Sequence, residues 1–273
     1  MTNRTFTFML LSLLLITLQA CNTLPQAHTT HLYIASDSTA TDYSTEPDYQ
    51  TKRYPQTGWG QVFQPLFTAE SLPRLKNLHV ANTVKVEPKA KGGRSTRSFF
   101  EEGRWREIYD ALQPGDLVLI QFGHNDQSKN KVDRYTPIDG YKQYLRMYVE
   151  NVRAKKARPI LMTSVSRNNR WENDKLQNTH GDYPQAVKDL AAEMKVDLID
   201  LNQLSMDLFN TKGQEYVSEK YFMNLPEGKF EAYPKGLTDN THFQPEGAEA
   251  VAKLVFEALT KLSATPSFKS TEK

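Results

Sequence analysis

Hydrophobic and polar positions along the chain follow two alternating patterns, which predict strands and helices in turn. Short apolar runs bounded by polar or turn residues are typical of buried strands, whereas apolar residues three and four positions apart are typical of amphipathic helices. Strands are predicted at residues 32–35, 78–86, 117–120, 160–162 and 196–201. Helices are predicted at residues 59–67, 98–112, 141–152, 186–194 and 245–262.

This alternation predicts a flavodoxin-like, three-layer α/β/α fold around a five-stranded parallel sheet. Sheets of this kind with the strand order 2-1-3-4-5 bind ligands beyond the carboxyl ends of their strands, where the order reverses. That point lies between the first and third strands. The segments that leave these two strands carry Ser38 and Asn125, so we expect the functional site at this edge of the sheet.

The N-terminus has the features of an export signal. Arg4 precedes an apolar run at residues 6–18, which is too short to span a bilayer comfortably as a mature helix. The run ends in Leu18-Gln19-Ala20-Cys21, which resembles the lipobox of bacterial lipoproteins. That resemblance implies a lipid on Cys21, and Asn22 after it favours the outer membrane. An ordinary secretory signal with an incidental cysteine is the alternative.

Composition narrows the classes of function. The formal net charge is only +2, which argues against a nucleic-acid-binding protein. The basic stretch at residues 85–97 is local, and Glu101 and Glu102 follow it, so we interpret it as a solvated loop. Cys21 is the only cysteine and the six histidines show no paired metal spacing, so neither a disulfide nor a metal or other cofactor is expected.

Four polar motifs offer the parts that acyl transfer to serine needs, namely a nucleophile, a base, a group that orients the base, and donors for the oxyanion. The motifs are Ser36-Asp37-Ser38, Gly92-Gly93-Arg94-Ser95, Gly123-His124-Asn125-Asp126 and Asp239-Asn240-Thr241-His242. Each motif alone is weak evidence for catalysis, since a serine after a strand is often a helix cap and paired glycines often make turns. The three-residue separation, however, lets Asp239 reach the Nδ1 side of His242.

In this order the four motifs resemble the blocks of the SGNH, or GDSL-like, hydrolase family. The resemblance implies a catalytic triad of Ser38, Asp239 and His242. It also implies an oxyanion hole formed by the backbone N–H groups of Ser38 and Gly93 and by the Asn125 side chain. The Gly-Asp-Ser of the family's first block reads Ser36-Asp37-Ser38 here. The expected organisation is a signal peptide at 1–20, a tether at 21–30, an SGNH hydrolase domain at 31–263 and a polar tail at 264–273.

Further motifs resemble the rhamnogalacturonan acetylesterase branch of that family. They lie at residues 58–61, 92–96, 123–126, 179–184 and 239–243, within a match over about 32–258. The branch implies removal of O-acetyl groups from a plant cell-wall polysaccharide such as rhamnogalacturonan, through an acetyl-Ser38 intermediate. Two places depart from its pattern: Pro88 replaces an Asn, and the loop at 167–171 reads Arg-Asn-Asn-Arg-Trp instead of an Arg pair followed by an aromatic.

Substrate contacts and function are open at this level. His124 is a candidate contact or a packing residue, and Trp171 and Tyr183 lie in predicted loops where aromatic rings can stack on sugars. One alternative is an SGNH esterase, lipase or thioesterase acting on other acyl esters or on peptidoglycan acetyl groups. A non-catalytic carbohydrate-binding lipoprotein with the same fold is the other. The sequence does not indicate an oligomeric state.

Overall fold

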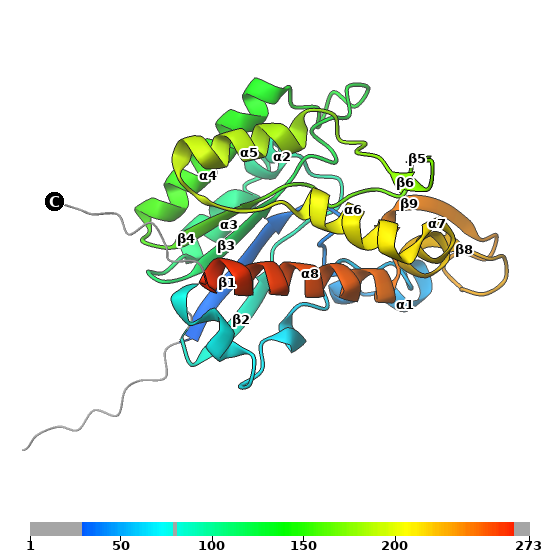
Figure 1. Ribbon diagram of the computed structural model, residues 1–273, viewed down its shortest axis with the longest axis horizontal. Coiled ribbons are helices and arrows are strands. Elements are labelled where there is room, and N and C mark those ends of the chain that lie inside the picture. Colours follow the sequence, from blue (N-terminus) through cyan, green and yellow to red (C-terminus); the bar gives the residue numbers. More distant parts are fainter. Residues whose placement is uncertain (1–28, 79–80, 265–273) are drawn as a thin grey trace, which may run out of the picture.

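A computed structural model describes residues 29–78 and 81–264, and its centre is one parallel sheet (Figure 1). The strands of this sheet are β1 (Thr29–Ser36), β2 (Thr83–Pro88), β3 (Leu117–Gln121), β4 (Arg158–Met162) and β7 (Asp197–Ile199). Their order is β2-β1-β3-β4-β7, and all neighbouring pairs are parallel. The predicted fold class is therefore confirmed, and the strand order is the 2-1-3-4-5 order considered above.

Helices cover both faces of the sheet (Figure 1). Successive side chains of the central strands therefore alternate between two buried clusters, one on each face. Tyr33 and Ala35 of β1 pack in the cluster that lies under α2, α3, α4 and α5, whereas Leu32 and Ile34 pack in the cluster under α6 and α8. The helices are α2 (Thr96–Glu101), α3 (Arg104–Ala111), α4 (Ile138–Ala154), α5 (Tyr183–Met194), α6 (Leu201–Lys212) and α8 (Pro245–Ala264).

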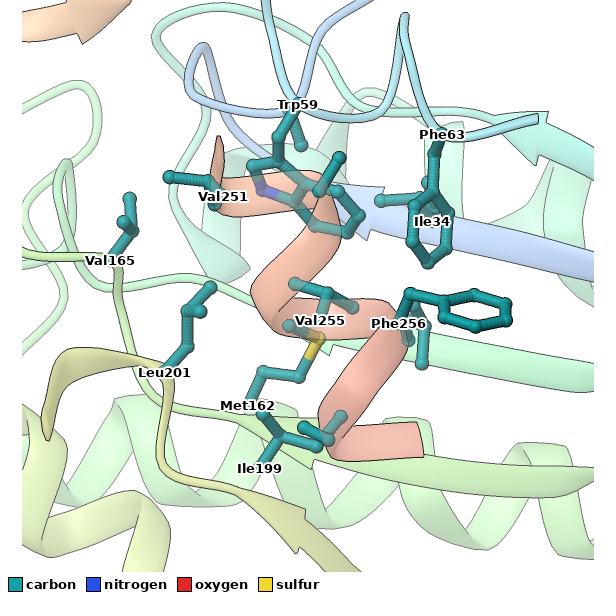
Figure 2. Close-up of a cluster of buried hydrophobic side chains, with 14 of the residues drawn as sticks. Ile34, Trp59, Phe63, Met162, Val165, Ile199, Leu201, Val251, Val255 and Phe256 are labelled. Atoms are coloured by element: carbon teal, nitrogen blue, oxygen red, sulfur yellow. The ribbon is translucent and has the colours of Figure 1, made fainter. Parts of the chain in front are cut away.

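The predicted helix at 59–67 is wrong. This segment consists of turns and one short 3₁₀ element, η2 (Gln64–Leu66). The Trp59 amide donates to the Thr39 carbonyl at 2.9 Å, and Gly58 lies so close to the Thr41 backbone that any side chain there would overlap it. Trp59 still projects into the core next to α8, together with Phe63 (Figure 2), so the pattern of burial is helical although the backbone is not.

Several other boundaries differ from prediction. Gly103, with φ at +76°, divides the predicted helix at 98–112 into α2 and α3. The predicted strand at 78–86 starts only at Thr83, and the one at 196–201 ends at Ile199 because Asp200 caps α6. The smaller elements are η1 (Tyr43–Thr45), α1 (Tyr49–Lys52), η3 (Leu72–Leu78), β5 (Trp171–Glu172), β6 (Lys175–Leu176), α7 (Gln214–Tyr216), η4 (Val217–Tyr221), β8 (Phe222–Leu225) and β9 (Leu237–Phe243).

The described residues begin with a strand and end with a helix. Strand β1 begins at Thr29 and α8 ends at Ala264. Within 29–78 and 81–264, none of the helices combines the length and the apolar character that a membrane span requires. The predicted signal peptide at 1–20, residues 21–28 of the predicted tether at 21–30, and residues 265–273 of the predicted tail at 264–273 lie outside the described residues.

Candidate active site

Ser38 lies just beyond the carboxyl end of β1, in a turn that its neighbours hold in place. The buried Asp37 carboxylate accepts hydrogen bonds from the Thr39 amide at 3.0 Å and from the Thr39 hydroxyl at 2.8 Å. The Tyr43 hydroxyl donates to the Ser38 carbonyl at 2.9 Å. These bonds fix the backbone on both sides of Ser38, whose own side chain is only half-buried.

His242 and Asp239 on β9 complete a continuous hydrogen-bonded chain with Ser38. The distance from His242 Nε2 to Ser38 Oγ is 2.9 Å, and the distance from His242 Nδ1 to Asp239 Oδ2 is 2.7 Å. The other carboxylate oxygen, Oδ1, accepts the amides of Thr241 at 2.8 Å and His242 at 3.1 Å. Burial alone raises the pKa of Asp239, but its bonds to His242 and to these amides outweigh burial and leave the pKa below 3.8.

Contacts with two distant loops hold β9 in place. The Thr57 amide donates to the Phe243 carbonyl at 2.9 Å. The Asn168 amide donates to the Asn240 carbonyl at 2.9 Å, and the Asn168 side chain donates to the Asn240 side-chain oxygen at 3.0 Å. Asn168 belongs to the 167–171 loop that departs from the branch pattern, so this departure supports the strand that carries Asp239 and His242.

The loops after β2 and β3 meet beside Ser38. A Cβ on Gly92 would lie 3.6 Å from the Ser38 Cβ, and Gly93 has a φ of +80°. Asn125 donates from Nδ2 to the Arg94 carbonyl at 3.0 Å, which uses one of its two amide N–H groups. The predicted residues Ser38, Gly93 and Asn125 therefore lie at one edge of the sheet.

Asp126 of the same motif has a structural partner. It is fully buried, and its Oδ1 accepts the Thr96 amide at 2.9 Å and the Thr96 hydroxyl at 2.6 Å at the start of α2. Burial raises the pKa of Asp126 to about 7, although the bonds from Thr96 oppose the shift. This contact ties the Asn125 loop to the loop that carries Gly93.

His124 packs beneath the site instead of lining an open surface. It is 3% exposed, and its ring meets the His180 ring edge-on at 4.5 Å between centroids. Burial first, and then the charges of His180 and Arg167, lower the pKa of His124 well below 6.5, so the ring is neutral near pH 7. The sequence left open whether His124 contacts substrate or packs in the protein, and the structure favours packing.

The two predicted aromatic contacts have different surroundings. Tyr183 begins α5 instead of lying in a loop, and its hydroxyl donates to the carbonyls of Asp126 at 3.1 Å and Thr136 at 2.7 Å. The prediction that Tyr183 lies in a loop is therefore wrong. Its ring is buried and presents no face on which a sugar could stack. Trp171 is half-buried against the core, and its Nε1 donates to Asn168 Oδ1 at 2.7 Å.

Three residues near the site carried no recognisable sequence signal as partners: Tyr43, Arg134 and Arg167. Arg134 donates from Nη1 to Asn125 Oδ1 at 3.4 Å, and Arg167 donates from Nη2 to the His124 carbonyl at 3.0 Å. The Arg167 contact joins two different loops, so spacing could not reveal it. The contacts of Tyr43 with Ser38 and of Arg134 with Asn125 form within irregular loops, whose conformation spacing does not predict. Among the described residues, no cluster of three or more His, Cys, Asp or Glu side chains could hold a metal ion.

The chain belongs to the GDSL-like lipase/acylhydrolase family, whose model matches residues 37–250, and it is therefore an ester hydrolase. It is 40% identical to the probable rhamnogalacturonan acetylesterase YesY of Bacillus subtilis, over 85% of this chain and 93% of YesY. It is 38% identical to the rhamnogalacturonan acetylesterase RhgT of Bacillus subtilis, over 85% of this chain and 90% of RhgT. Among solved structures, Bacillus subtilis YxiM aligns with a TM-score of 0.69 and 27% identity, over 89% of this chain and 59% of that chain.

Proposed function

We propose that this chain removes O-acetyl groups from acetylated rhamnogalacturonan, with Ser38 as the nucleophile. The observation that carries the proposal is the continuous chain from Ser38 Oγ through His242 to Asp239, with links of 2.9 and 2.7 Å. A serine becomes an effective nucleophile when a base takes its proton, and a third group that orients the base makes it more effective. The relatives YesY and RhgT, which bear the name of this activity, support the choice of substrate.

The first half of the reaction makes an acetyl-enzyme. Ser38 Oγ attacks the acetyl carbonyl carbon while His242 Nε2 accepts the hydroxyl proton. Asp239 keeps the other ring proton on Nδ1 and stabilises the imidazolium that forms. The tetrahedral intermediate then collapses, the C–O bond to the sugar breaks, and His242 returns the proton to the departing sugar oxygen.

Three donors are proposed to stabilise the oxyanion of each tetrahedral intermediate: the amides of Ser38 and Gly93 and the second N–H of Asn125 Nδ2. Such donors act where negative charge develops, and removing one typically lowers turnover by about a hundredfold or more. In the second half, His242 takes a proton from water, the resulting nucleophile attacks the acetyl-enzyme, and acetate leaves as Ser38 regains its proton.

Acetate release from acetylated rhamnogalacturonan tests this function directly. The full-length protein should release acetate, Ser38→Ala should not, and Ser44→Ala, which changes an exposed serine on η1, should match the unaltered protein. Greater activity on long-chain acyl esters or on peptidoglycan acetyl groups would favour the alternative esterases. Failure of Ser38 to react with a serine-directed organophosphorus inhibitor would favour the non-catalytic carbohydrate-binding protein.

We further propose that the mature protein is anchored to a bacterial membrane, the outer membrane in particular, through lipid on Cys21. The support is the segment Leu18-Gln19-Ala20-Cys21-Asn22 after an apolar run. Cys21→Ala should abolish membrane association and globomycin-sensitive processing. Unchanged fractionation of that variant would refute the anchor without affecting the esterase assignment.

A further inference from the structure

Arg134 lies beside the residues that we propose to bind the oxyanion, although no sequence motif includes it. Its Nη1 is 3.4 Å from Asn125 Oδ1 and 3.1 Å from the point where a Cβ on Gly93 would lie. The Arg134 side chain is 26% exposed, so part of its guanidinium faces solvent at this edge of the sheet. This cation therefore lies beside two of the three groups that we propose to bind the oxyanion.

The loop of Arg134 is held firmly against its neighbours. The Thr136 amide donates to the Asp126 carbonyl at 2.9 Å, and the Arg134 amide donates to the Lys131 carbonyl at 3.0 Å. Arg97, in the first turn of α2, donates to the Val132 carbonyl at 2.5 Å. The position of the guanidinium is thus set by the same loops that set Gly93 and Asn125.

The carboxylate partner of Arg134 leaves much of the guanidinium available. Nε and Nη2 each lie 3.0 Å from Asp133 Oδ2, and the Asp133 side chain is 66% exposed. Ion pairs this exposed are weak and exchange readily. Together with the contact to Asn125, these bonds use three of the five N–H donors of a guanidinium, so two donors remain for a ligand.

Positive charge is concentrated on the two loops that meet at this edge. Residues 89–97 hold four cations and no acid, although Arg94 pairs with Glu102 at 3.0 Å and Lys89 lies 3.8 Å from Glu87. Residues 124–135 hold three cations and two acids. One of the two acids, Asp126, is fully buried. The basic stretch that the sequence suggested to be a solvated loop therefore borders the proposed acyl site, where it favours an anionic substrate.

From this geometry we infer that Arg134 is a specificity residue that binds a uronate carboxylate of the polysaccharide, near the acetylated sugar. The inference rests on the proposed function, because galacturonate units give rhamnogalacturonan the carboxylates that neutral acetylated glycans lack. The planar guanidinium matches a carboxylate with two parallel N–H···O bonds, which a lysine ammonium cannot reproduce.

The test compares acetylated rhamnogalacturonan oligosaccharides whose uronates are free with the same oligosaccharides after methyl esterification, with acetate release as the readout for the full-length protein. The unaltered protein should prefer the free uronates by about tenfold to a hundredfold in kcat/KM, as one charge-assisted contact provides. Arg134→Gln should lose this preference. Lys131→Gln, which removes an equal charge from an exposed position on the same loop, should retain most of it.

Two results would overturn the inference while leaving the proposed function intact: an unaltered protein that releases acetate equally from both substrates, or an Arg134→Gln protein that keeps the preference. If the glutamine variant does not fold, Arg134→Lys makes the same test and should keep less than half of the preference. An unaltered protein that hydrolyses 4-nitrophenyl acetate but neither oligosaccharide would overturn the proposed function and this inference together.

Discussion

Replacing Asp239 by asparagine exchanges a single oxygen for an NH₂ group and should reverse the proton arrangement of His242. The two carboxylate oxygens of Asp239 have different partners: Oδ1 accepts two backbone amides at 2.8 and 3.1 Å, and Oδ2 faces His242 Nδ1 at 2.7 Å. In the variant the carboxamide oxygen must stay with the amides, because an NH₂ group cannot accept their hydrogens. Two hydrogen bonds at about 1 kcal/mol each favour this orientation by about thirty to one.

The changed hydrogen bonding alters the tautomer of His242, the catalytic base. The NH₂ group then donates to Nδ1, so the neutral imidazole carries its proton on Nε2, which lies 2.9 Å from Ser38 Oγ and can no longer accept the hydroxyl proton. Loss of the correct tautomer in a Ser-His-Asp triad lowers kcat by about ten thousandfold. We expect a loss of this size for Asp239→Asn, measured as kcat on 4-nitrophenyl acetate at pH 7.

Asp239→Ala is the matched variant, because it removes the orienting group without imposing the wrong tautomer. It should be no less active than the asparagine variant. Thermal unfolding of both variants should show that the protein is folded in the assay. An asparagine variant that keeps more than about a tenth of the unaltered activity would refute the assigned role of Asp239, since the expected loss is so much larger.

Three further substitutions test the fold around the site. Trp59→Ala should lower the free energy of unfolding by about 3–5 kcal/mol in urea denaturation, because Trp59 is fully buried; a loss below about 1 kcal/mol would contradict this. Gly247→Ala should lower it by about 1–3 kcal/mol, because its Cβ would lie 2.7 Å from the Tyr221 Cα, and unchanged stability would be the contrary result. Burial holds the pKa of Asp126 near 7, above the 3.8 of an ordinary carboxyl, so the folded protein loses stability as pH rises from about 4 to about 7, by up to about 4 kcal/mol. Asp126→Asn should remove this part of the pH dependence, and equal slopes in thermal unfolding between pH 4 and pH 8 would contradict it.

Local sequence determined the sheet and one half of the proposed triad. Short apolar runs predicted the central strands because a strand buried on both faces needs apolar side chains at successive positions. Asp239 and His242 are three residues apart, so their contact needs only the local backbone of β9. Ser38 and Asn125 follow neighbouring strands, and the parallel order of those strands places both at the same edge.

Long-range packing decided the conformation of residues 59–67. Periodic burial indicates which side chains reach the core, and Trp59 and Phe63 do reach it. It does not determine the backbone between them. The close approach of Gly58 to Thr41 and the bond from the Trp59 amide to Thr39 replace helical hydrogen bonds there, and both contacts join segments that the sequence keeps apart.

The same separation explains what the sequence could not reveal about the site. Ser38 and His242 are 204 residues apart and meet only because β9 is held by the Thr57 and Asn168 loops. Arg134 lies in a polar loop without a motif, and only the folding of that loop onto the Gly93 segment brings its guanidinium to the proposed acyl site. Residue type and spacing thus determined which catalytic groups the chain can supply. Tertiary contacts decided which charged side chains surround those groups, because these side chains lie in irregular loops whose conformation depends on packing.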